Sequence, residues 1–169
     1  EDIVDGTITS TITIAVDDAN SEDDFDVVVD QTVSVDTFDD DAAGFTIVEL
    51  DGATEVTEAG NTDTFTVVLD AQPTSDVVLT VTSGDTSEGT VNSPLTFTPA
   101  NWDTPQTVTV TGVDEDIVDG TITSTITIAV DDANSEDDFD AVADQTVSVD
   151  TTDDDAAGFT IVELDGATE

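Results

Sequence analysis

A near-identical internal repeat constrains this chain more than any other feature of its sequence. Residues 1–55 recur at 115–169, whereas residues 56–114 occur once. Of the 55 repeated positions, 52 are identical, and the three differences are Val27 to Ala141, Val29 to Ala143 and Phe38 to Thr152. A repeat of 114 residues has the size of one ordinary domain, so the chain is predicted to be built from tandem modules.

The acidic run Asp153-Asp154-Asp155 and its earlier copy Asp39-Asp40-Asp41 mark the ends of modules, because a new apolar segment follows each run. We therefore predict three parts. They are the C-terminal half of a preceding module at 1–41, one complete module at 42–155, and the first strand of a following module at 156–169.

Apolar residues alternate with polar ones along most of the module. Ile122, Ile126, Ile128 and Val130 fall on one side of a segment whose other side is rich in Thr. This period of two, with many Val and Thr residues, favours strands over helices. Turn sequences such as Asp119-Gly120 separate the segments. We predict an all-β fold, an immunoglobulin-like antiparallel β-sandwich of about seven strands.

The charge is entirely of one sign. The chain contains 42 Asp and Glu residues and no Lys, Arg, His or Cys. Catalysis by a His base, a Lys Schiff base or a Cys nucleophile is therefore excluded, and a nucleic-acid partner is not expected because nothing neutralises phosphate. No apolar run is long enough for membrane insertion. Crowded carboxylates must instead be compensated by N–H groups, protons or bound cations.

The acidic residues gather between predicted strands. One cluster is Asp114-Glu115-Asp116, a second extends from Asp131 to Asp140, and a third is Asp153-Asp154-Asp155. Two carboxylates about 4 Å apart repel each other by about 1 kcal/mol even in water, and a divalent cation reverses the sign of that interaction. The first and third clusters are predicted to bind Ca²⁺, which prefers oxygen ligands. The alternative is a solvated acidic surface that binds nothing specific.

Several short motifs together resemble the Calx-beta domain, in the form repeated in tandem in large bacterial extracellular adhesin and matrix proteins. The segments are Val56-Thr-Glu58-Ala-Gly60, 64–69, 97–102, 106–116 and 149–155. The resemblance implies an immunoglobulin-like sandwich with a calcium site at one tip. It places the metal ligands of the complete module on Glu58, Asp85, Asp114, Glu115, Asp116, Asp153, Asp154 and Asp155. In the partial first module the corresponding residues are Glu1, Asp2, Asp39, Asp40 and Asp41, without a counterpart of Glu58.

The leading hypothesis is a calcium-binding structural repeat of an extracellular or cell-surface bacterial protein, an adhesin, stalk or matrix filament without enzymatic activity. Calcium would stiffen the junctions, and the partners would be neighbouring repeats of the same chain. Two alternatives remain open: a fibre subunit that exchanges strands with other copies, and a calcium-dependent glycan-binding module. Enzymatic chemistry would be limited to carboxylate pairs, and one Trp without Tyr argues against a sugar-cleaving site.

Overall fold

The alternation in the sequence becomes an alternation of burial along extended strands. The structure, a computed structural model, describes residues 2–162. In β5 (Thr62–Leu69), Phe65, Val67 and Leu69 are buried and the residues between them are not. The same pattern holds in β6 (Val77–Ser83), β9 (Gln106–Gly112) and β11 (Gln145–Thr152). Side chains of one parity therefore supply the core.

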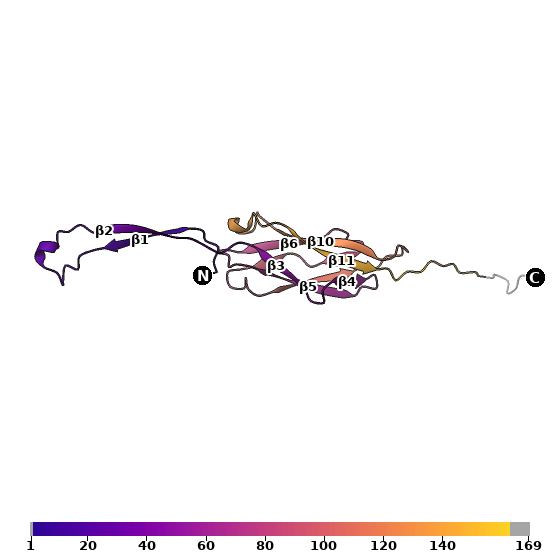
Figure 1. Cartoon of the computed structure of the whole chain (residues 1–169). Helices are drawn as coiled ribbons and strands as arrows, with labels where there is room; N and C mark the ends of the chain where they lie inside the picture. Colours follow the sequence, from indigo (N-terminus) through magenta and orange to yellow (C-terminus); the bar gives the residue numbers. More distant parts are fainter. Residues whose placement is uncertain (1, 163–169) are drawn as a thin grey trace, which may run out of the picture.

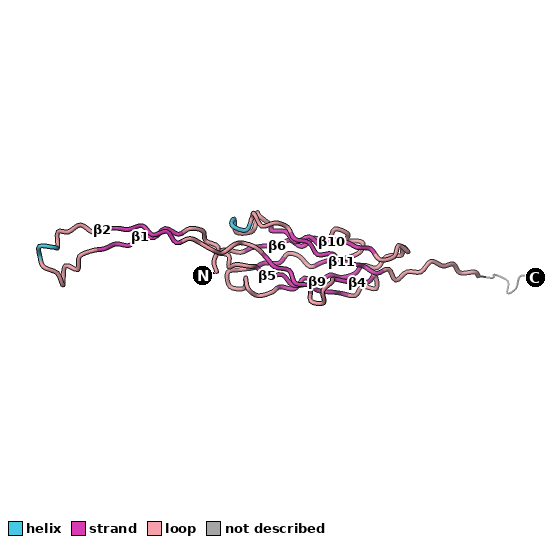
Figure 2. The backbone as a smooth tube through the Cα atoms, viewed as in Figure 1, coloured by secondary structure: helices cyan, strands magenta, loops and turns pink. Residues whose placement is uncertain are grey.

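Two sheets face each other around this core (Figures 1 and 2). The larger sheet has the strand order β4-β11-β10-β6-β8 and adds β4 (Thr54–Thr57), β8 (Leu95–Phe97) and β10 (Ile122–Val130) to the strands above. The smaller has the order β3-β5-β9-β7 and adds β3 (Phe45–Glu49) and β7 (Gly89–Val91). All pairs are antiparallel except β4 with β11. The predicted immunoglobulin-like β-sandwich is confirmed.

The sandwich contains nine strands instead of about seven because two segments cross between the sheets. The first segment contributes β3 to one sheet, turns at Gly52 with φ +85°, and contributes β4 to the other. The second is divided into β7 and β8 around Ser93-Pro94. The alternation of apolar and polar residues predicts which side of a strand faces the core. It does not predict which of the two sheets the strand joins.

One continuous hydrophobic core fills the space between the sheets. Its largest fully buried side chains include Phe65, Phe97, Leu79 and Ile126. Phe139 joins them from the short 3₁₀ helix η2 (Asp137–Phe139), which lies beyond β10. Among the described residues, the buried members of this core run from Phe45 to Val149, and Val4 packs against them from outside that range.

Residues 8–37 form a separate hairpin, and its two strands pair in the same register as the strands of the repeated copy at 122–151. β1 (Ile8–Ile14) pairs with β2 (Gln31–Thr37) in the register that joins β10 to β11, with Ile12 opposite Val33 as Ile126 is opposite Val147. The helix η1 (Asp23–Phe25) lies at its far end (Figure 2). Ile12 is 53% exposed and Ile126 is 0% exposed. The same sequence thus pairs alike in both copies, but only one copy is covered by a second sheet.

The chain leaves the sandwich after β11 as an extended segment (Figure 1). Residues 156–162 form no strand, although the identical residues 42–48 include most of β3, which pairs with β5. Residues 163–169 of the predicted first strand lie outside the described residues. The division at 41/42 and 155/156 falls between β2 and β3 and after β11, and it stays a prediction. No helix within 2–162 is long and apolar enough to cross a membrane.

Candidate metal centre

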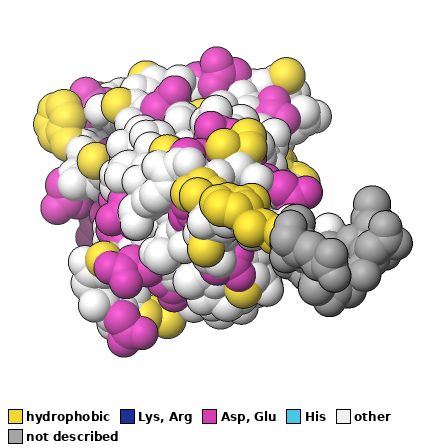
Figure 3. All heavy atoms as spheres, turned by 90° about the vertical axis from the view of Figure 1, so that its right-hand side faces the viewer, with side chains coloured by type: hydrophobic (Ala, Val, Ile, Leu, Met, Phe, Trp, Pro, Cys, Tyr) yellow, Lys and Arg dark blue, Asp and Glu magenta, His cyan; other side chains and the backbone are white. Residues whose placement is uncertain are grey.

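Loops from both sheets meet at the end of the sandwich where the chain leaves β11. Backbone hydrogen bonds tie these loops together: Glu58 N–H donates to Thr152 O over 3.2 Å, and Val113 N–H donates to Glu88 O over 3.0 Å. Figure 3 looks toward this end of the molecule and shows Asp and Glu side chains around the emerging segment, with no basic side chain among them. The acidic residues of distant loops are therefore held together by the backbone.

Glu58 is placed at the centre of this end by the parallel pairing of β4 with β11. Thr57 is opposite Thr152 at the ends of the two strands, so the residues that follow them, Glu58 and Asp153, lie side by side. The side chain of Glu58 is 0% exposed, and neither carboxylate oxygen has a hydrogen-bond partner. A buried carboxylate without a partner is costly, so this residue requires a compensating proton or cation.

Glu88 and Glu115 approach from the other sheet. β7 pairs with β9, with Gly89 opposite Gly112, which places Glu88 beside the start of the loop that carries Glu115. Glu88 is buried, and one oxygen of each of these two carboxylates is buried without a partner. Gly112 allows this arrangement, because a Cβ there would lie 2.0 Å from the carbonyl oxygen of Thr57.

Asp153 organises the loop before β10 through backbone N–H groups. Its Oδ2 accepts hydrogen bonds from Asp119 N at 3.0 Å and from Gly120 N at 2.8 Å. Its Oδ1 accepts one from Asp155 N at 2.7 Å. Gly120 has φ +78°, a conformation that favours glycine. These bonds, first those from Gly120 and Asp155, lower the pKa of Asp153 below its usual value, so its charge is stabilised.

At this end of the sandwich, two groups of carboxylates have the spacing of ligands to a single ion. Glu58, Glu115 and Asp119 each offer an oxygen within 4.8 Å of the others, and so do Glu58, Asp153 and Asp155. Two oxygens bound to one Ca²⁺ at roughly 2.4 Å lie no more than about 4.8 Å apart. Glu58 belongs to both groups and lies between the loop before β10 and the segment after β11.

The pKa values of the carboxylates at this end also show that these groups are crowded and buried. Burial raises the pKa of Glu58; the approach of the Asp154 N–H opposes this in part, and the charges of Asp153 and Glu115 add to the rise. Burial is also the largest cause of the raised pKa of Glu88, Glu115 and Asp155, followed by neighbouring carboxylates. In the absence of a cation, these groups therefore resist full ionisation.

The donor set fits a hard divalent cation. Every orphaned buried carboxylate atom of the described residues belongs to this end, namely both Oε atoms of Glu58, Oε2 of Glu88, Oε1 of Glu115 and Oδ2 of Asp155. Calcium takes six to eight oxygen ligands, carboxylates among them. Softer metals prefer His and Cys ligands, and the chain has neither.

The structure brings together four of the eight ligands expected for the complete module: Glu58, Glu115, Asp153 and Asp155. The others lie near them but in neither group. Asp85 accepts hydrogen bonds from the hydroxyl and from the N–H of Ser87, which lower its pKa. The remaining three, Asp114, Asp116 and Asp154, are exposed, and their charges raise the pKa of Asp155.

Two residues of the site were not among the sequence candidates. Asp119 belongs to the first group, and its position just after Asp114-Glu115-Asp116 was the available signal. Glu88 stands alone in Thr86-Ser87-Glu88-Gly89, and no local pattern distinguishes it. Only the pairing of β7 with β9 places its carboxylate beside the cluster.

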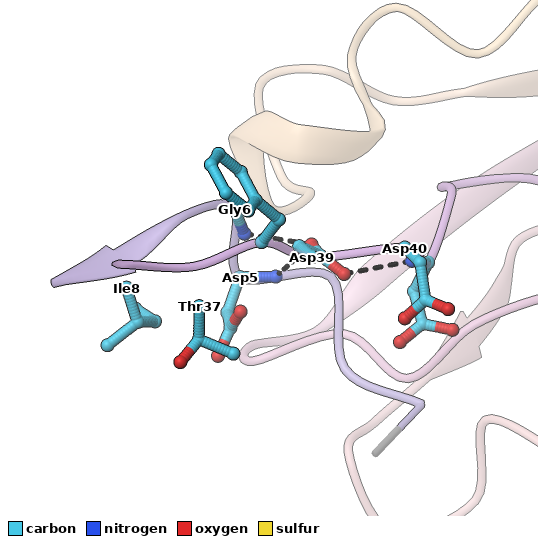
Figure 4. Close-up of a pocket in the computed structure, with 8 residues that line it drawn as sticks. Asp5, Gly6, Ile8, Thr37, Asp39 and Asp40 are labelled. Carbon is cyan, nitrogen blue, oxygen red and sulfur yellow. Dashed lines mark hydrogen bonds between the residues drawn. The ribbon is translucent and has the colours of Figure 1, made fainter. Parts of the chain in front are cut away.

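The partial first module repeats the acidic turn at its junction with the sandwich. Asp39 Oδ2 accepts hydrogen bonds from Asp5 N at 3.0 Å and Gly6 N at 2.8 Å, as Asp153 does from the equivalent residues (Figure 4). Oxygens of Asp39, Asp40 and Asp41 lie within 4.8 Å of one another. Asp2 is exposed and not in this group, and Glu1 lies outside the described residues.

The second acidic cluster has a structural explanation at its buried member. Glu136 accepts hydrogen bonds from the N–H of Thr74 at 2.7 Å, from the Thr74 hydroxyl and from the N–H of Ser75 at 3.3 Å. Neither of its oxygens is orphaned. This carboxylate anchors the loop after β10 to the loop before β6, and it does not require an ion.

Comparisons with known proteins give likenesses of shape at low sequence identity. No known family matches the sequence, and no curated protein does either. The apo Calx CBD1 domain is 17% identical, with a TM-score of 0.44 over 66% of this chain and 98% of that domain. Domains 4 and 5 of the S-layer protein SbsC are 22% identical, with a TM-score of 0.42 over 73% and 63%. The E. coli chaperone DraB is 7% identical, with a TM-score of 0.46 over 68% of this chain and 59% of its own.

Proposed function

We propose that this chain is a calcium-binding structural repeat of an extracellular adhesin, stalk or matrix filament. In this proposal Glu58, Glu115, Asp119, Asp153 and Asp155 hold Ca²⁺ at the tip of the sandwich. The ion stiffens the junction with whatever follows Asp155. The proposed role is mechanical and not catalytic, in agreement with a composition that lacks His, Lys and Cys.

The observation that carries the proposal is the unpartnered burial of Glu58. A solvated acidic surface would leave its carboxylates in water, but this side chain is fully buried and neither oxygen has a partner. The surrounding groups are themselves acidic, so no side chain of this chain can neutralise it. A bound cation supplies both the charge and the ligand contacts that Glu58 lacks.

A shared proton is the competing way to compensate Glu58. Its neighbour Asp153 keeps its charge through three backbone hydrogen bonds, so the proton would reside on Glu58, whose pKa is raised. Acidic conditions favour that state. At neutral pH and extracellular calcium concentrations, Ca²⁺ displaces the proton, because extracellular modules bind calcium with dissociation constants of roughly 10⁻⁴–10⁻³ M.

The location of the ligands explains how an ion would stiffen the chain. Asp153 and Asp155 lie on the segment that leaves β11, whereas Glu58 follows β4 and Glu115 follows β9. Glu58 belongs to both groups, so ions bound there tie the outgoing segment to Glu58 and Glu58 to the loop after β9. Without the ion, mutual repulsion of the carboxylates favours a loose outgoing segment.

The experiment is a titration with Ca²⁺ at constant ionic strength, followed by melting temperature and small-angle scattering. A calcium-selective rise in melting temperature supports the proposal, because an ion that binds only the folded state stabilises it. Equal stabilisation by Na⁺ at the same ionic strength would indicate general acidity of the surface and would refute a specific site.

A fibre subunit is the second candidate, favoured by the open face of the β1–β2 hairpin. Ile8, Ile12, Ile14, Val33 and Val35 are exposed there, and the matching side of β10–β11 is buried by the opposite sheet. A second copy that pairs or packs against this hairpin would cover the face. Sedimentation at increasing protein concentration tests this candidate, and a monomer throughout would argue against it.

A further inference from the structure

The two copies of the loop Asp-Ile-Val-Asp-Gly have different surroundings. In the first copy, Ile3 forms a parallel β-bridge with Gln72, which lies in the turn between β5 and β6 of the sandwich. Gln72 N–H donates to Asp2 O at 2.6 Å, and Val4 N–H donates to Gln72 O at 3.1 Å. The partial first module is thus fastened to the next module by a short piece of sheet.

The side chains support the same contact. Val4 packs against the hydrophobic core of the sandwich. In the second copy, the equivalent residues Ile117 and Val118 are 60% and 53% exposed. The turn that receives Val4 is itself well built, because Ala71 and Pro73 are buried and Gln72 Nε2 donates to Pro99 O at 2.7 Å. This turn therefore holds the N–H and the carbonyl of Gln72 in position to bond with the incoming segment.

We propose that Asp116–Val118 is a docking segment whose partner is the Ala71–Pro73 turn of a following copy of this module. The identical segment Asp2–Val4 already makes this contact within the chain, with both backbone hydrogen bonds and the apolar contact in place. The sequence 156–169 repeats 42–55, so a following module of this sequence would begin at the correct distance.

The docking segment also belongs to the loop that carries the candidate ligands. Asp116–Val118 lies between Glu115 and Asp119, which share an ion-sized group with Glu58. In this proposal one loop supplies both candidate ion ligands, Glu115 and Asp119, and the residues that dock on the following module. The docking proposal itself depends on hydrogen bonds and packing and holds whether or not calcium binds, so the two proposals can fail separately.

The test compares the present chain with one extended after Glu169 by a second copy of residues 56–155, which completes a following module. Amide hydrogen exchange is measured at residues 4 and 118 in both chains, with calcium and with chelator. In the present chain we expect a slowly exchanging amide at Val4 and a fast one at Val118. In the extended chain we expect the amide of Val118 to slow at least tenfold, to the rate of Val4.

Exchange at Val118 that remains equally fast in both chains and both buffers would overturn the docking proposal. Slowing in either buffer supports it. The proposed calcium function is judged separately, by the calcium-dependent melting temperature of the same chains, so either proposal can fail while the other stands. Matched substitutions sharpen the test. In the present chain, Val4→Ser should speed exchange of the Gln72 amide, and Val118→Ser should leave that amide unchanged. An equal effect of both substitutions, or no effect of either, would contradict the specific contact.

Discussion

A carboxylate oxygen of Glu58 lies within 4.8 Å of one from Asp153, although the two residues come from different halves of the module. The parallel pairing of β4 with β11 creates this neighbourhood, because Thr57 is opposite Thr152 and the next two residues are both acidic. Asp153 is charged and held by backbone N–H groups, whereas Glu58 has no partner. This asymmetry makes Glu58 the residue at which a cation has the largest effect.

Replacement of Glu58 by Gln removes the unpartnered charge with little change in volume. In chelator we expect the melting temperature to stay the same or rise, because the repulsion by Asp153 and Glu115 disappears. With calcium, we expect most of the calcium-dependent rise in melting temperature to be lost. The matched control is Glu55→Gln, an exposed residue of β4, the strand that ends just before Glu58, which should keep the full calcium response. Equal responses of the two variants would exclude Glu58 as a ligand.

The raised pKa values predict a pH dependence that calcium reverses. Burial raises the pKa of Glu58, Glu88, Glu115 and Asp155 in the folded state. Between the ordinary carboxyl pKa of roughly 4 and these raised values, the folded state binds more protons than the unfolded chain. The free energy of unfolding in chelator therefore falls as the pH rises through this window.

Thermal melts from pH 4.5 to 8 measure this dependence. With saturating calcium, the chain should be more stable at pH 7.5 than at pH 4.5, because at pH 4.5 protons compete with the ion for the carboxylates. Glu58→Gln should reduce the pH slope in chelator more than Glu55→Gln does, which separates the site from the general repulsion of 42 acidic groups. A slope that is the same in both variants would assign the effect to that general repulsion.

Gly112→Ala should destabilise the sandwich with and without calcium. A Cβ at this position would lie 2.0 Å from the carbonyl oxygen of Thr57, so β4 and β9 would have to separate. We expect a loss of about 3 kcal/mol or more in unfolding free energy, in the range of severe core overpacking. Gly158→Ala is the control, because its Cβ would be 4.0 Å from the nearest atom. Urea denaturation of both variants measures the difference, and a near-wild-type midpoint for Gly112→Ala would contradict this packing.

The chain contains two copies of the same hairpin, β1–β2 and β10–β11, so their amide exchange can be compared within one molecule. Amides of β10 and β11 should exchange slowly, because these strands belong to a five-stranded sheet over a core. Amides of β1 and β2 should exchange faster by at least a hundredfold, because an isolated two-stranded hairpin is marginally stable in water. Hydrogen exchange resolved by residue measures this contrast. Equal protection would mean that β1–β2 is covered by another copy in solution, as the fibre candidate requires.

The sequence predicted the fold class well, because apolar alternation in β5, β6 and β10 depends on local side-chain order alone. It did not predict that the first segment divides into β3 and β4 or that β7 and β8 join different sheets. Those crossings depend on how the two sheets close. Residues 45–48 of β3 and residues 159–162 have the same sequence, and of these two described copies only the one with β5 beside it forms a strand.

The candidate site was predictable where acidic residues cluster along the chain, as at Glu115, Asp153 and Asp155. Glu88 was not, because its place depends on the register of β7 against β9. Glu58 was assigned from the motif around it, and its burial at the end of the sandwich adds a physical reason for the assignment. The exposed residues Asp114, Asp116 and Asp154 illustrate the limit of clustering in sequence, since their immediate neighbours Glu115, Asp153 and Asp155 are partly buried and they are not.

The most direct test of the central claim is a calorimetric titration of calcium into the chain and into its Glu58→Gln variant, both in about 0.15 M NaCl near neutral pH. We predict saturable binding with a dissociation constant of roughly 10⁻⁴–10⁻³ M or tighter, and a marked loss of that binding in the variant. Weak heats that do not saturate and are identical for both proteins would contradict a calcium site built around Glu58.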